Sequence, residues 1–140
     1  MQSKLAFDAV ATYVPTWTGL TTNPVLGNGT IAGRYTQIGK IVFLHIYLLM
    51  GGTTTYGTGF WKFSLPVTAI AAATSKGRNG TARFTDSSAT ATYGSFARAD
   101  DTNGVTLRTS AAPTVLVDLN NPFVWATGDE LEVDIVYEAA

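Results

Sequence analysis

The side chains that could support chemistry in this sequence are few. His45 is the only histidine, so a zinc site that clusters several imidazoles is excluded. It stands among apolar residues in the segment Ile41–Leu49, where a hydrogen-bonded core or interface histidine is favoured over a catalytic or ligand-binding one. His45 is therefore expected to have a structural role and not a catalytic one.

Carboxylates gather near the C-terminus at Asp129, Glu130, Glu132 and Asp134. Paired acids of this kind could serve in glycoside hydrolysis or bind calcium. Their spacing along a predicted strand favours a solvated face instead. The segment Asp100–Gly104 is also rich in oxygen ligands, but it lacks the later acid of a calcium-binding loop, and a polar turn is favoured. We therefore predict no catalytic residue, no metal and no cofactor, and the protein is not expected to be an enzyme.

Aromatic rings are the remaining candidates for ligand binding, because a π-face can stack on a sugar ring. Tyr56 lies in a loop rich in glycine and threonine, and Trp17 lies close to the N-terminus. These two are the candidate ligand-binding residues. A sugar site on them is the minority alternative to a purely structural role.

Composition limits the class of protein. Hydrophobic residues make up 46% and charged residues 14% of 140 residues, against about 25% charged residues in a typical soluble domain. So little charge suggests that part of the surface is covered by another subunit. The net charge of −1 gives no broad attraction to nucleic acid or to a membrane surface, and the absence of cysteine excludes disulfides. The chain is expected to be soluble, with no visible export signal.

Threonine, β-branched and aromatic residues are abundant, and turn signals such as Asn79-Gly80 and Gly128-Asp129 recur along the chain. This pattern predicts an all-β protein, an antiparallel β-sandwich that is jelly-roll-like and has about eight strands. We expect a single domain over residues 1–140, with residues 1–12 as an N-terminal arm. The expected strands are Thr30–Gln37, Ile41–Leu49, Gly59–Leu65, Thr81–Thr85, Ala89–Arg98, Val105–Arg108 and Asp129–Glu138. Val115–Leu119 and the stretch near Ala9–Val14 are candidates for additional edge strands.

Two of these strands carry the strongest patterns. In Asp129–Glu138, apolar and acidic residues alternate, which predicts one face in the core and one in solvent. In Ile41–Leu49 both faces are apolar, so the second face needs a cover. We assign that cover to a neighbouring subunit, and the alternative is a loop of the same chain. The predicted oligomer interface comprises Val42, Phe43, Leu44, His45, Ile46 and Tyr47.

Several short segments occur in an order that resembles a β module of virion proteins from tailed phages, especially those of actinobacterial hosts. They are Pro15–Gly19, Asn23-Pro24, Gly27–Thr30, Gly33–Lys40, Gly57–Pro66 and Trp125–Leu131. The resemblance covers residues 13–66 and 122–137 and leaves residues 69–113 unplaced. Such modules are similar to the trimeric jelly rolls of the tumour-necrosis-factor and complement globular-head type, in which Gly-Asp before the last strand also occurs.

The resemblance implies a homotrimer on the exterior of a virion, made in the host cytoplasm. A capsid decoration protein or similar surface knob is the first expectation, with other capsid or tail proteins as partners. The alternative is a tail-fibre tip that recognises a host-surface glycan. No catalytic residue of the family maps onto this chain.

Overall fold

We describe the protein from a computed structural model, over residues 10–71, 78–99, 103–110 and 115–140. Within these ranges the chain forms nine strands and no helix. The strands are β1 (Ala11–Tyr13), β2 (Trp17–Gly19), β3 (Thr30–Ile38), β4 (Ile41–Leu49), β5 (Trp61–Ser64), β6 (Asn79–Asp86), β7 (Ala91–Ala99), β8 (Gly104–Thr109) and β9 (Glu130–Glu138).

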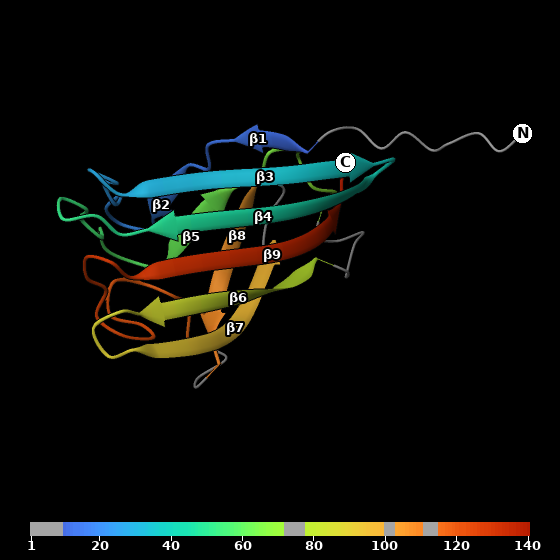
Figure 1. Ribbon diagram of the computed structural model, residues 1–140. Coiled ribbons are helices and arrows are strands. Elements are labelled where there is room, and N and C mark those ends of the chain that lie inside the picture. Colours follow the sequence, from blue (N-terminus) through green and yellow to red (C-terminus); the bar gives the residue numbers. More distant parts are fainter. Residues whose placement is uncertain (1–9, 72–77, 100–102, 111–114) are drawn as a thin grey trace, which may run out of the picture.

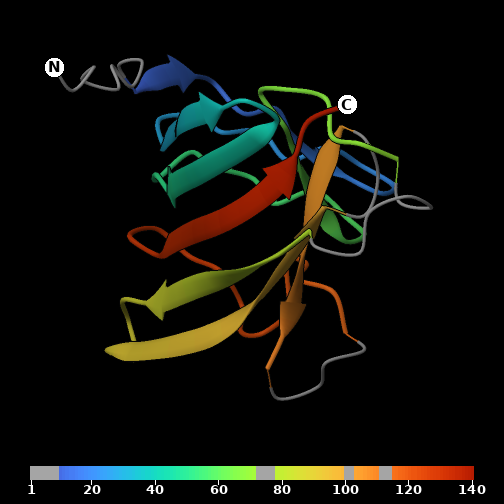
Figure 2. The same cartoon turned by 90° about the vertical axis from the view of Figure 1, so that its right-hand side faces the viewer.

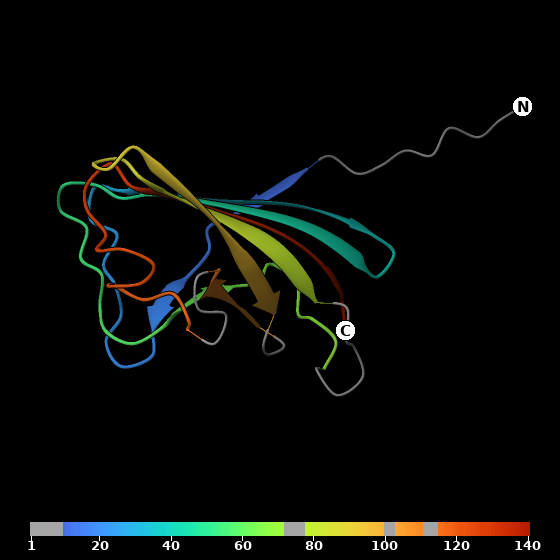
Figure 3. The same cartoon turned by 90° about the horizontal axis from the view of Figure 1, so that it is seen from below.

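The strands form one antiparallel sheet in the order β1-β3-β4-β9-β6-β7-β8-β5-β2. The sheet curls over, so that β1, β3, β4, β9 and β6 make one layer and β8, β5 and β2 make the other (Figures 1 and 3). The long, bent β7 passes from the first layer toward the second, and Figure 2 shows β8 running steeply across the direction of β9 and β6. The predicted all-β, antiparallel, sandwich-like class is confirmed.

The core lies between the two layers and follows from the alternation of side chains along each strand. On β9, Leu131, Val133, Ile135 and Tyr137 are at most 2% exposed, as the period-two pattern predicts. The other layer contributes Trp61, which is fully buried. Burial of these apolar side chains is the main stabilising contribution to a domain that has no disulfide.

Predicted and observed strands agree best where the pattern is long. The bounds of Ile41–Leu49 are reproduced, and the last strand begins one residue later than predicted. Strand Trp17–Gly19 was not predicted. In Val115–Leu119, the paired residues form only isolated β-bridges and no strand. Strand β1 already pairs with β3 at Ala11, so the predicted N-terminal arm does not extend as far as residue 12.

Candidate functional site

The face of the first layer that points away from the core is the candidate site, and we call it the outer face. Strands β3, β4, β9 and β6 lie side by side in the sheet (Figure 1), and their outward side chains form this face. Phe43 on β4 and Val136 on β9 are direct neighbours in the register and are 47% and 42% exposed. Ile41 beside them is 40% exposed. Large apolar side chains on adjacent strands therefore lack a cover within the described chain.

The structure separates the two apolar faces of β4. Val42, Leu44 and Ile46 are 0–3% exposed and belong to the core of their own chain. They have no surface left for a partner, so including them in the predicted interface was wrong. Phe43, His45 and Tyr47 point outward and keep the role of candidate interface residues.

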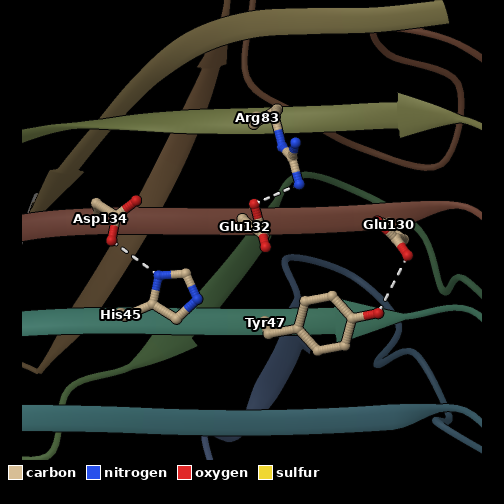
Figure 4. Close-up of polar contacts among 6 residues, drawn as sticks. All are labelled: His45, Tyr47, Arg83, Glu130, Glu132 and Asp134. Atoms are coloured by element: carbon tan, nitrogen blue, oxygen red, sulfur yellow. Dashed lines mark hydrogen bonds and ion pairs between the residues drawn. The ribbon is translucent and has the colours of Figure 1, made fainter.

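Polar pairs cross the outer face between neighbouring strands (Figure 4). The imidazole Nδ1 of His45 lies 2.8 Å from a carboxylate oxygen of Asp134, and their side chains are 39% and 69% exposed. On the same face a guanidinium nitrogen of Arg83 lies 2.6 Å from a carboxylate oxygen of Glu132. The hydrogen bond predicted for a core or interface His45 is present, and the residue lies on the exposed outer face and not in the core.

The third polar pair on this face involves Tyr47, whose hydroxyl donates to Glu130 Oε1 at 3.2 Å (Figure 4). Partial burial and the adjacent Glu130 carboxylate raise the pKa of Tyr47. The phenol is therefore neutral at physiological pH. The outer face thus mixes exposed apolar groups with acids that are hydrogen-bonded to neighbouring strands.

A shallow hollow of about 430 Å³ lies in the outer face. Phe43, Val136 and Val10 contribute apolar groups to its lining, whereas Arg34 and His45 contribute polar ones. Its remaining lining residues are Tyr35, Thr36, Leu44, Asn79, Gly80, Thr81, Asp134 and Ile135. An apolar hollow with polar groups at defined positions is suited to receive a side chain or ligand that has both characters.

The predicted sugar-stacking residues lie elsewhere and are mostly engaged. Trp17 is 8% exposed, and its ring contacts Trp61 edge-on at 4.9 Å and stacks on Phe63 at 6.3 Å. Its ring is therefore part of the core, and the prediction of ligand binding by Trp17 was wrong. Tyr56 is half-buried and stacks on Trp61 at 6.4 Å, which occupies one of its ring faces.

The sequence pattern placed Asp129 with Glu130, Glu132 and Asp134 on a solvated strand face, but the structure gives Asp129 a different role. It is fully buried, and Oδ1 accepts hydrogen bonds from the backbone N–H of Ser87 at 2.9 Å and from the Ser87 hydroxyl at 3.0 Å. Oδ2 accepts from the backbone N–H of Ala126 at 2.7 Å. The carboxylate joins the β6–β7 turn to the loop before β9. Gly128, with φ of 89°, provides the turn that aims it.

Two further findings concern chemistry and membranes. Within the part of the chain that the structure describes, no three histidine or acidic side chains lie close enough to hold a metal ion together. Asp100 to Thr102, the acidic part of the predicted polar turn, lie outside the described residues. No helix within the same described ranges is long and apolar enough to cross a bilayer.

Comparison with known proteins gives one informative similarity. The chain is 29% identical to part of the Mu-like prophage FluMu defective tail fiber protein of Haemophilus influenzae, over 90% of this chain. The chain spans only 20% of the length of that curated relative. No protein-family model and no solved structure matches the chain. The similarity supports a phage structural protein as the class to which this all-β domain is related.

Proposed function

We propose that this domain is a non-enzymatic structural module of a phage tail fibre, and that it acts as a homotrimer on the exterior of the virion. The observation that carries the proposal is the outer face, where exposed apolar residues on neighbouring strands are left without a cover. Apolar groups exposed side by side and bordered by polar residues are typical of a protein interaction site. The low content of charged residues, 14%, agrees with a surface that is partly covered by other subunits.

We favour a role in a tail fibre over a role as a capsid decoration protein because the relative is a tail fiber protein by name. A chain that spans 20% of that relative would be one module of a longer fibre. Most soluble homo-oligomers have closed symmetry, and the modules that this sequence resembles are trimers.

A host-surface glycan is left out of the proposal, because Trp17 is buried and Tyr56 already stacks on Trp61. The proposal also contains no reaction. His45 and Asp134 are hydrogen-bonded to one another on an open sheet face, where their side chains are 39% and 69% exposed, and this pair is read as a structural contact between strands.

Immunogold labelling of purified phage particles tests the proposed position. Antibodies raised against the folded domain should decorate the fibres at the tail, and pre-absorption of the antibody with the domain should abolish the label. Label distributed over the head would contradict the tail fibre and favour the decoration protein. Particles without any label, from phage that make the protein, would contradict a place on the virion exterior.

A further inference from the structure

Two opposite charges on the outer face have no partner within the described chain. Arg34 on β3 is exposed and lines the hollow, and neither an ion pair nor a hydrogen bond engages its guanidinium there. Glu138 near the end of β9 likewise has no side-chain partner among the described residues. The other acids on the outward side of β9, at positions 130, 132 and 134, each contact a neighbouring strand.

The register shows that Arg34 and Glu138 cannot pair within one chain. Arg34 is opposite His45, whereas Glu138 is opposite Ile41, which is itself opposite Ile38. The two positions are thus four residues apart along the strands and two strands apart across the sheet. With a rise of about 3.4 Å per residue and a strand spacing of about 4.8 Å, their Cα atoms are separated by about 17 Å. That distance is beyond the reach of a direct ion pair.

Apolar side chains fill the space between these charges. Phe43 and Val136, paired across β4 and β9, lie between the row of Arg34 and the row of Glu138, and Ile41 lies next to Glu138. An uncovered apolar centre with an unpaired cation on one side and an unpaired anion on the other is complementary to a second copy of itself. One copy's anion can meet the next copy's cation while the apolar centres come together.

Building on the proposed homotrimer, we infer that Arg34 of each copy forms an ion pair with Glu138 of its neighbour across the outer face. The partner is thus a second copy of this chain, and the pair fixes the direction in which the copies contact one another. Burial of Phe43 and Val136 provides most of the attraction, and the charges select the register.

Charge reversal with restoration tests this pair. The variants are Arg34→Glu, Glu138→Arg and the double variant that carries both changes, each measured by analytical ultracentrifugation over a range of concentrations. The matched control is Arg108→Glu, which makes the same charge change on β8, in the other layer. Circular dichroism on each variant checks that the sheet is retained.

Each single reversal should raise the dissociation constant at least about tenfold, whereas the double variant should return to within about threefold of the wild type. Single reversals that associate as tightly as Arg108→Glu would overturn the pair, while leaving the trimer and the proposed function in place. Failure of the double variant to recover would overturn it as well. A wild-type dimer that shows the expected pattern would support the ion pair and contradict the homotrimer, so the two proposals can fail separately.

Discussion

Phe43 and Leu44 are adjacent in the sequence and point to opposite faces of β4. Substitution by aspartate should therefore have a different effect at each position. Phe43 is 47% exposed on the outer face, whereas Leu44 is 3% exposed in the core. Phe43→Asp is expected to dissociate the assembly and leave a folded chain. Leu44→Asp is expected to unfold the chain itself.

The magnitudes follow from burial. Leu44→Asp removes a buried side chain that contributes about 2–3 kcal/mol and places a carboxylate in an apolar core at a cost of several more. Together these losses approach a total stability that is about 5–15 kcal/mol for a domain. Phe43→Asp loses the partial burial of a side chain that is 47% exposed, together with some strand propensity, so its effect on folding should be about 1–2 kcal/mol. An unpaired charge trapped at a subunit contact weakens association by about 4 kcal/mol, which is about a thousandfold.

Sedimentation velocity and thermal melting followed by circular dichroism separate these outcomes. Phe43→Asp should sediment as a monomer with the far-ultraviolet spectrum of a β-sheet, and Leu44→Asp should lack a cooperative melting transition. The reasoning would be refuted if Phe43→Asp kept the mass of the wild type. It would be refuted equally if Leu44→Asp melted like the wild type, because β4 would then have the opposite orientation.

Three further predictions concern single residues. Asp129→Asn should lower the free energy of unfolding by about 2–4 kcal/mol in urea denaturation, because an amide nitrogen cannot accept the backbone N–H bonds of a buried carboxylate. Asp134→Asn, with a side chain 69% exposed, is the matched control when both variants are made in the monomeric Phe43→Asp background, and there it should cost less than about 0.5 kcal/mol. Burial raises the pKa of Tyr137 from 10.0 to about 12, so the folded chain holds a proton that the unfolded chain loses. Stability should therefore fall as the pH rises from 10.0 to about 12, by at most about 1.4 kcal/mol per pH unit, with a shallower slope in Tyr137→Phe. His45→Gln should change the free energy of unfolding of the monomeric Phe43→Asp background by less than about 1 kcal/mol, because the His45–Asp134 pair is largely exposed; a larger loss in the same urea titration would contradict this.

Much of the fold could be predicted from local pattern. The alternation in Asp129–Glu138 determines which side chains are buried, and the glycines around Ile41–Leu49 limit that strand to its observed length. The three-residue strand Trp17–Gly19 is too short to show a period, and it is held as a strand by its pairing with β5. The placement of β9 between β4 and β6 depends on contacts far apart in the sequence, which a local pattern does not contain.

The candidate site was predictable only in part. Because both faces of Ile41–Leu49 are apolar, the sequence does not say which of Phe43 and Leu44 faces outward, and β9 and the opposite layer decide it by packing. The partner of His45 is 89 residues away, so its identity as Asp134 required the register. Asp129 differs from its acidic neighbours because it precedes the strand and turns inward beside Gly128, and the Gly-Asp pair noted in the sequence is the one local sign of this.

The mass of the wild-type protein in solution is the measurement on which the proposed assembly depends. Sedimentation equilibrium at micromolar concentration should give three copies of the 14.8 kDa chain, about 44 kDa, with the outer face protected from hydrogen exchange along β4 and β9. A single species of 14.8 kDa at that concentration, with Phe43 and Val136 accessible to solvent, would contradict the homotrimer.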